Sequence, residues 1–174
     1  MISVCEATPN DIDTIRDLAE RIWPAAYGKI ISARQISYML NLFYSDEKLN
    51  TDLQSGQMFL LTKDGSRHVG FAGIEHRWNG DPVTRIHKIY VLPDQQGKGI
   101  GKLLMQEIEK RAVAKSDTKL SLNVNRQNPA QEFYHHLGFE KVKVEDIDIG
   151  QGYLMEDFVM EKPLNRDSDS RLGQ

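Results

Sequence analysis

Three alternate glycines near the middle of the chain are the residues whose spacing most directly indicates chemistry. Gly97, Gly99 and Gly101 follow Gln96, where an apolar segment ends and a helical pattern begins. Glycine permits positive φ and lets another group approach the backbone closely. A helix start also presents unpaired N–H groups and the positive end of its dipole. The segment therefore predicts a site for a phosphate or pyrophosphate, with a tightly packed helix start as the alternative.

The spacing of these glycines excludes two common phosphate-binding loops. A P-loop requires Ser or Thr after its Gly-Lys pair, and here Leu103 follows Lys102. The dinucleotide fingerprint requires Gly-x-Gly-x-x-Gly after the first strand, whereas these glycines alternate strictly and lie in the middle of the chain. Neither nucleotide-binding family is predicted.

Other reactive patterns are absent from the sequence. The five histidines have no zinc-ligand spacing, there is no His-Glu-x-x-His, and no Gly-x-Ser-x-Gly nucleophile turn occurs. The sequence therefore predicts no metal site. A single cysteine, Cys5, allows no internal disulfide and fits a reducing compartment.

The composition excludes some classes of partner. The chain has 174 residues with 22 Lys plus Arg, 25 Asp plus Glu and a formal net charge of −3. Such a balance argues against a protein that works mainly by electrostatic adhesion to nucleic acid or to an anionic membrane. No apolar run approaches the ~20 residues of a membrane span, and residues 1–4 do not resemble a signal peptide. We expect a cytoplasmic protein.

The elements that must position the glycine turn are predicted from periodicity and turn signals. Thr8 and Pro9 begin a helix, which Pro24 is expected to end. Further helices are expected over 32–44, about 100–115 and 128–137, with a short one over 45–54. The expected strands are 2–7, 58–62, 68–76, 84–92, 120–124, 139–149 and 153–160.

These elements predict an α+β fold in the order β-α-α-β-β-β-α-β-α-β-β. The sheet should be mixed and mostly antiparallel, with six to seven strands flanked by helices. We expect one domain over residues 1–164 and a disordered tail over 165–174, because the tail has no apolar periodicity.

Two motifs carry a resemblance to a known family. Residues 96–101, Gln-Gly-Lys-Gly-Ile-Gly, resemble the Gln/Arg-x-x-Gly-x-Gly/Ala pyrophosphate loop of the GNAT superfamily of N-acetyltransferases. Residues 130–139 resemble that family's Ala-x-x-Phe/Leu-Tyr-x-x-x-Gly-Phe segment, and the element order over about 2–164 also matches. In finer detail, residues 22–27 and 157–162 are similar to bacterial polyamine acetyltransferase-like members.

The resemblance implies acetyl-coenzyme A as the co-substrate and a primary amine, spermidine or a related polyamine, as the acceptor. The family often has Asn three residues before the Ala of the second motif, but Gln127 is there. Either Asn125 or Asn128 could then contact the pantetheine arm, and Asn128 is equally a helix cap. The implied coenzyme-binding residues are Ile89, Tyr90, Val91, Gln96, Gly97, Lys98, Gly99, Ile100, Gly101, Lys102, Asn125 and Asn128.

For catalysis, the second motif implies that Tyr134 is the general acid that protonates the leaving thiolate. Glu75 and His87 are the candidate bases, with a water chain as the alternative. Trp23 and Tyr27 are candidate acceptor-binding residues, because aromatic faces hold cations, although they could simply pack between helices. Acidic side chains of the last strands could hold the acceptor by charge. A homodimer through the terminal strands is also implied by the family.

Three other functions fit parts of the pattern. A non-catalytic acyl-coenzyme A binding or sensing module would bind coenzyme A tightly without transferring acetyl groups. An acetyltransferase of protein N-termini or of another small amine would use the same donor. A nucleotide-phosphate binder of another fold would be stabilised by ATP or NAD and not by coenzyme A.

Overall fold

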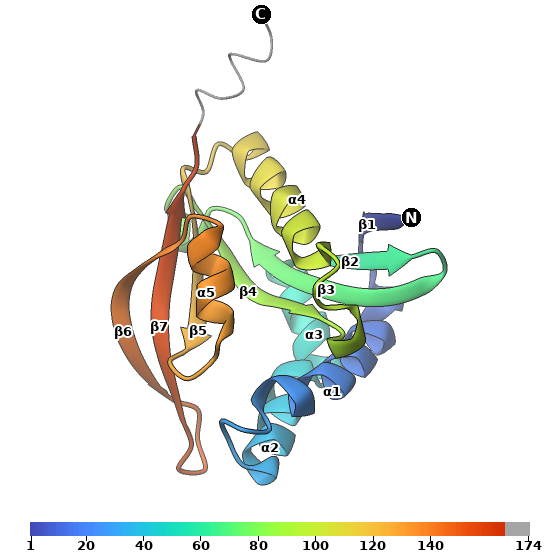
Figure 1. Ribbon diagram of the computed structural model, residues 1–174, viewed down its shortest axis with the longest axis vertical. Coiled ribbons are helices and arrows are strands. Elements are labelled where there is room, and N and C mark those ends of the chain that lie inside the picture. The colour runs from blue at the N-terminus through green and yellow to red at the C-terminus, as the bar shows by residue number, and fades with distance from the viewer. Residues whose placement is uncertain (166–174) are drawn as a thin grey trace, which may run out of the picture. The chain divides into compact units, whose positions relative to one another are not determined.

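A computed structural model describes residues 1–165 (Figure 1). The chain divides into two units. The first comprises Met1–Ile74 and His87–Met105, and the second comprises Glu75–Ile86 and the chain from Gln106 onward. Of the expected tail, only Asn165 is among the described residues. The predicted domain boundary at residue 164 stays a prediction.

The first unit contains three antiparallel strands and three helices. Strand β1 (Ile2–Glu6) pairs with β2 (Met58–Asp64), and β2 pairs with β3 (Arg67–Glu75) across the Asp64-Gly65 turn predicted from the sequence. The helices are α1 (Ile12–Tyr27), α2 (Ala33–Tyr44) and α3 (Asp46–Gln54). Their buried faces follow the predicted apolar spacing, and the largest fully buried side chains include Ile15, Leu18, Ile22, Tyr44, Leu49, Phe59, Leu60 and Phe71.

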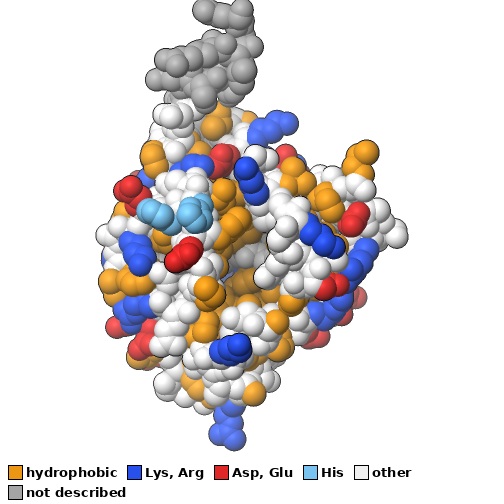
Figure 2. All heavy atoms as spheres, viewed as in Figure 1, with side chains coloured by type: hydrophobic (Ala, Val, Ile, Leu, Met, Phe, Trp, Pro, Cys, Tyr) orange, Lys and Arg blue, Asp and Glu red, His pale blue; other side chains and the backbone are white. Residues whose placement is uncertain are grey.

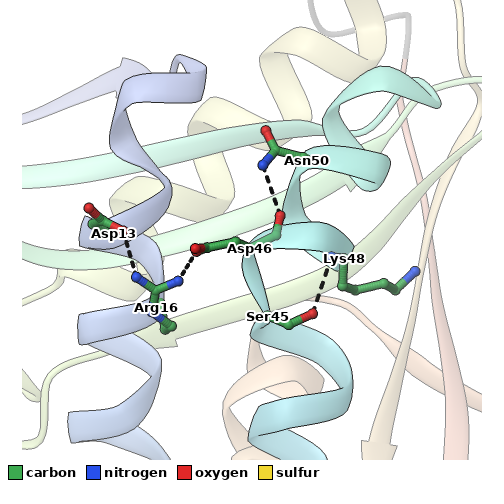
Figure 3. Close-up of polar contacts among 6 residues, drawn as sticks. All are labelled: Asp13, Arg16, Ser45, Asp46, Lys48 and Asn50. Atoms are coloured by element: carbon green, nitrogen blue, oxygen red, sulfur yellow. Dashed lines mark hydrogen bonds and ion pairs between the residues drawn. The ribbon is translucent and has the colours of Figure 1, made fainter.

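Short polar side chains fix where these helices begin. Thr8 and Asp11 form a capping box before the 3₁₀ turn η1 (Pro9–Asp11), as the sequence predicts. Ser45 caps α3 by accepting a hydrogen bond from the N–H of Lys48 at 3.2 Å. In Figure 3, Arg16 of α1 lies between Asp13 of its own helix and Asp46 at the start of α3, and donates to both carboxylates. Arg16 therefore links the N-terminal end of α3 to α1.

Helix α1 continues past Pro24, so the prediction that this proline ends the helix is wrong. A proline in a helix removes one N–H and crowds the carbonyl four residues earlier, and here the helix continues in spite of this cost. The last turn closes when the N–H of Gly28 donates to the Pro24 carbonyl at 2.9 Å. Trp23 and Tyr27 therefore lie one turn apart on the same helix, with ring centroids 4.6 Å apart.

The second unit is built around three further strands. Strand β4 (Val83–Val91) belongs to both units, and its first residues pair in parallel with β5 (Lys119–Asn125). Strand β7 (Leu154–Pro163) pairs antiparallel with both β5 and β6 (Glu140–Asp148). The β6–β7 hairpin turns at Gly150 and Gly152, which both have positive φ. Helices α4 (Ile100–Ala114) and α5 (Ala130–His136) complete the elements, along with the 3₁₀ turns η2 (Trp78–Gly80) and η3 (Pro93–Gln95).

A buried cluster anchors the turn between β3 and β4. The Thr84 hydroxyl donates to the fully buried Asp117 carboxylate at 2.6 Å and lies 2.8 Å from His76 Nδ1. Because the hydroxyl proton is used by Asp117, Nδ1 must carry the proton that His76 donates to Thr84. The other ring nitrogen, Nε2, is buried and has no hydrogen-bond partner among residues 1–165. Burial lowers the pKa of His76, and Asp117 partly opposes this effect.

The hydrogen-bonded strand order is β1-β2-β3-β4-β5-β7-β6, one sheet of seven strands. The predicted α+β class and the mostly antiparallel sheet are confirmed. The element order matches the prediction, with the short helix expected over 45–54 present as α3. No helix within residues 1–165 has the length and apolar content needed to cross a membrane. On the face drawn in Figure 2, acidic and basic side chains are interspersed.

Candidate active site

The glycine turn in the first unit has the backbone geometry that its sequence predicts. Gly97 and Gly99 have φ values of +81° and +78°, and α4 begins immediately afterwards at Ile100. A Cβ built on either glycine would meet no atom of the other described residues within 4 Å. Glycine is therefore required here by the backbone conformation and not by crowding from neighbouring residues.

The N–H groups of this turn have no hydrogen-bond acceptor in the part of the chain that the structure describes. Among residues 1–165, none of the backbone N–H groups from Gly97 to Lys102 donates a hydrogen bond to another protein group, whereas the N–H of Leu103 already bonds to the Gly99 carbonyl at 3.0 Å. The first turn of α4 adds the positive end of its helix dipole. This arrangement can hold an anion with several oxygen atoms, such as a diphosphate.

Side chains hold the approach to the turn in place. Gln95 is buried, and its Oε1 accepts a hydrogen bond from Lys98 Nζ at 3.4 Å. Gln96 Nε2 lies 3.5 Å from the Val91 carbonyl, so this side chain folds back toward the strand. Arg67 of β3 pairs with Asp94 at 3.0 Å, and this hydrogen bond lowers the pKa of Asp94. These contacts fix the residues that lead into the glycine turn.

The end of β4 lies unusually close to β3. A Cβ on Gly70 would lie 2.7 Å from the Tyr90 carbonyl oxygen and 2.8 Å from Thr62 Oγ1, so only glycine fits there. The N–H of Leu92 donates to the Val69 carbonyl at 2.9 Å. The backbone of Ile89–Val91 is therefore fixed against β3.

The aromatic candidates Trp23, Tyr27 and Tyr90 come together in the first unit. The hydroxyls of Tyr27 and Tyr90 are 2.8 Å apart, and the Trp23 ring contacts both rings at centroid distances of 4.6 and 5.9 Å. Tyr44 meets Trp23 edge-on at 5.8 Å. The result is an aromatic cluster, consisting of Trp23, Tyr27, Tyr44 and Tyr90, that joins α1 and α2 to β4.

Lys88 is a buried group that the sequence patterns missed. Its side chain is 10% exposed, and Nζ lies 5.5 Å from the Tyr44 ring centroid and 3.7 Å from Asp52 Oδ2. Burial lowers the pKa of Lys88, and Asp52 opposes this effect. Strand alternation, which places Lys88 on the same face as Tyr90, is the signal that could have identified it.

The remaining site candidates of the second unit lie on β5, the following turn and α5. Asn125 Oδ1 accepts from the N–H of Gln127, and Asn128 Oδ1 accepts from the N–H of Ala130, each at 2.9 Å. Both side-chain oxygens therefore stabilise the turn before α5. Tyr134 is 9% exposed, and its ring packs against those of Phe133 and Phe139.

The two candidate bases are not brought together within one unit. Glu75 is the last residue of β3 and belongs to the second unit, whereas His87 lies on β4 in the first. Both are partly buried. By strand alternation, His87 lies on the opposite face of β4 from Lys88 and Tyr90.

A polar network in the second unit was also missed by the sequence patterns. Arg85 donates to Ser121 Oγ at 2.9 Å and to Asn123 Oδ1 at 2.6 Å. Asn123 Nδ2 in turn donates to Glu145 and to the buried Asp157, each at 3.2 Å. Burial lowers the pKa of Arg85 and raises that of Asp157. Within residues 1–165, no group of three or more His, Cys, Asp or Glu side chains could hold a metal ion.

Comparison with known proteins identifies the family. The family model for the acetyltransferase (GNAT) domain matches residues 29–159, a range that includes both the glycine turn and the segment around Tyr134. This chain belongs to the GNAT family. The GNAT chain is 31% identical over 161 residues to spermidine N(1)-acetyltransferase of Thermoplasma acidophilum, a match that covers 89% of this chain and 96% of that protein.

Solved structures agree with the GNAT assignment. The crystal structure of the PaiA N-acetyltransferase from Thermoplasma acidophilum in complex with coenzyme A has a TM-score of 0.78 and 30% identity, covering 94% of this chain and 99% of that one. A GCN5-related N-acetyltransferase from Rhodopseudomonas palustris has a TM-score of 0.80 at 22% identity, covering 93% and 95%. The second comparison shows the fold alone. As a GNAT member, the protein is an acetyltransferase.

Proposed function

We propose that this GNAT acetyltransferase moves the acetyl group of acetyl-coenzyme A to a primary amine of a small molecule, a polyamine such as spermidine. The observation that carries the proposal is the row of N–H groups from Gly97 to Lys102, which have no protein acceptor within residues 1–165. Support for the donor also comes from the 30% identical neighbour, whose crystal structure contains coenzyme A. Support for the acceptor comes from the 31% identical spermidine N(1)-acetyltransferase.

In this proposal, the glycine turn binds the diphosphate of the coenzyme. Hydrogen bonds from N–H groups to a charged acceptor contribute about 1.5–3 kcal/mol each. Gln96 and Lys98 keep the turn in shape, as their contacts with Val91 and Gln95 indicate. The backbone of Ile89–Val91 would bind the pantetheine arm, together with the Nδ2 group of Asn125 or Asn128.

The amine must lose a proton before it can attack the thioester. A primary amine with a pKa near 10.4 requires roughly 4–5 kcal/mol to become neutral at pH 7. Glu75 and His87 stay the predicted bases for this step. Attack forms the new C–N bond, and expulsion of the coenzyme as a thiolate breaks the C–S bond.

Tyr134 is the proposed donor of the proton that the leaving thiolate needs. The ordinary pKa of tyrosine, about 10, is close enough to that of a thiol, about 8.5, for such a transfer. Its packing against Phe133 and Phe139 would hold the ring in one orientation. Trp23 and Tyr27 are the proposed acceptor contacts, because their rings can hold an ammonium group and an alkyl chain.

Acetylation of a mixed amine library, read by mass spectrometry, tests this proposal. Polyamines should gain one acetyl group, while peptides with free N-termini should stay unmodified. Tyr134→Phe should lower kcat by about 10²–10⁴-fold and leave the calorimetric Kd for coenzyme A within twofold. Unchanged kcat would refute the role of Tyr134. Tight coenzyme binding without any acetylated product would instead favour the non-catalytic binding module.

A further inference from the structure

Two acidic side chains of the second unit converge on one amide group. Asn123 Nδ2 of β5 donates to Glu145 Oε2 of β6 and to Asp157 Oδ2 of β7, each at 3.2 Å. The strand register places Glu145 directly opposite Asp157 on the β6–β7 hairpin. Two carboxylates that share one nitrogen repel each other when both are charged, so this carboxylate pair favours a proton or a bound cation.

The described part of the chain supplies no cation to the carboxylate pair. Two neighbouring acids of the hairpin, Asp146 and Glu156, lie within ion-pair distance of Arg126, whereas no ion pair there involves Glu145 or Asp157. Asp157 is only 3% exposed, and its second oxygen, Oδ1, has no hydrogen-bond partner in the same part of the chain. A buried carboxylate is normally paired, because removing its charge from water is costly. Burial raises the pKa of Asp157, and the charge of Glu145 adds to this effect.

Arg85 of β4 does not neutralise the carboxylate pair directly. Its guanidinium donates to Asn123 Oδ1 at 2.6 Å and to Ser121 Oγ at 2.9 Å, and lies 4.9 Å from the centroid of the Trp78 ring. Because Asn123 Oδ1 accepts from Arg85, the Nδ2 group is the part of the amide that faces the carboxylates. Arg85 therefore fixes the orientation of Asn123 and leaves the two acids for another cation.

The carboxylate pair lies beside a proposed coenzyme contact of the same unit. Asp157 is directly opposite Asn125 in the register of β5 and β7. Directly opposite residues of antiparallel strands share one face of the sheet, with Cβ atoms about 4.5–5.5 Å apart. Glu145 is only partly buried, so the pair is not sealed from solvent. A cation bound there would lie next to the segment that is proposed to hold the pantetheine arm.

We propose that Glu145 and Asp157 bind an ammonium group of a diamine or polyamine acceptor, at the end that is not acetylated. This inference rests on the proposed function and adds a second contact for its acceptor. A carboxylate stabilises the charged form of a neighbouring amine and raises the pKa of that amine. The site therefore suits an ammonium that stays charged, since the amine that attacks the thioester must first lose a proton.

Calorimetric titration with putrescine, a four-carbon diamine, and with butylamine, the monoamine of the same length, tests the site. The titrations are made at pH 7, where both amines are charged, and with coenzyme A present, so that no acetyl group is available. Asp157→Asn keeps an acceptor oxygen for Asn123 but removes the charge. It should raise the Kd for putrescine by about 10-fold or more, as expected when a hydrogen bond to a charged group is lost, and leave the Kd for butylamine within about twofold.

Glu156→Gln is the matched control on the same strand. It removes the same unit charge from β7, but the Glu156 side chain is 56% exposed and lies on the opposite face from Asp157 by strand alternation. The Kd for putrescine should stay within about twofold of wild type in this variant. If Asp157→Asn does not fold, as judged by circular dichroism, Glu145→Gln carries the test and should show the same selective loss.

Three results overturn the inference. Wild type could bind putrescine no more tightly than butylamine, or Asp157→Asn could weaken both amines equally. Glu156→Gln could also weaken putrescine binding as much as Asp157→Asn, which would show an effect of overall charge and not of the site. Selective putrescine binding that Asp157→Asn abolishes, without acetylation of any amine by wild type, would support the site and refute the proposed function.

Discussion

Replacing Gly99 by alanine separates the cost of a strained turn from the loss of a ligand contact. Gly99 has φ +78°, a region in which a Cβ approaches the following carbonyl oxygen at a cost of about 1–2 kcal/mol. Among residues 1–165, no atom lies within 4 Å of the new Cβ, so steric overlap with these residues adds nothing to that cost. The free energy of unfolding should therefore fall by about 1–2 kcal/mol, which corresponds to a Tm lower by about 2–8 °C for a chain of this size.

The effect on coenzyme binding should be separate from this loss of stability. The methyl group would project into the open space beside N–H groups that have no protein acceptor within residues 1–165. Losing one hydrogen bond to a charged phosphate costs about 1.5–3 kcal/mol, which raises Kd by about 10- to 150-fold. Calorimetric titration with coenzyme A measures this change, and denaturant unfolding measures the stability.

Gly80 provides a matched control in the second unit. Gly80 has φ +80°, and a Cβ there would also meet no atom of the described residues within 4 Å. Gly80→Ala should lower the free energy of unfolding by the same amount as Gly99→Ala while leaving the Kd for coenzyme A unchanged. If the two variants bind coenzyme A equally well, the turn does not bind the diphosphate and the reasoning is refuted.

Two further predictions concern stability. Gly70→Ala should lower the free energy of unfolding by about 1–3 kcal/mol, because the new Cβ would overlap the Tyr90 carbonyl. Urea denaturation measures this change. A variant as stable as wild type would show that β3 can move away from β4. His76 has a lowered pKa in the folded protein, so the unfolded chain binds more protons, and wild-type stability should fall as the pH drops below about 6.5. His76→Asn keeps a hydrogen-bond donor for Thr84, and its free energy of unfolding should fall less steeply than that of wild type as the pH drops below about 6.5. Equal slopes of the free energy of unfolding against pH for the two proteins would contradict this prediction.

The local features of the fold could be predicted from the sequence, because their causes lie within a few residues. The capping box of Thr8 and Asp11 and the positive φ of Gly97 and Gly99 follow from short-range chemistry. Pro24 is the exception, since the packing of α1 outweighs the local cost of the proline.

The long-range contacts could not be predicted in the same way. The pairing of Lys88 with Asp52 depends on where α3 packs against β4, which no local pattern specifies. The contact of Asn123 with Glu145 and Asp157 depends on the register of β5, β7 and β6. Polar residues that meet across a sheet look like ordinary surface residues until the strand order is known.

The path of the chain determines how this protein can be divided. The backbone passes from one unit to the other after Ile74, Ile86 and Met105, and the last two crossings lie inside β4 and α4. A single cut therefore never yields a fragment that contains one complete unit and nothing of the other. A fragment that ends at Met105, for example, would keep the whole first unit but would also carry Glu75–Ile86 of the second unit without the rest of that unit. Exchanging either unit between related enzymes would require joining segments that are separate in the sequence.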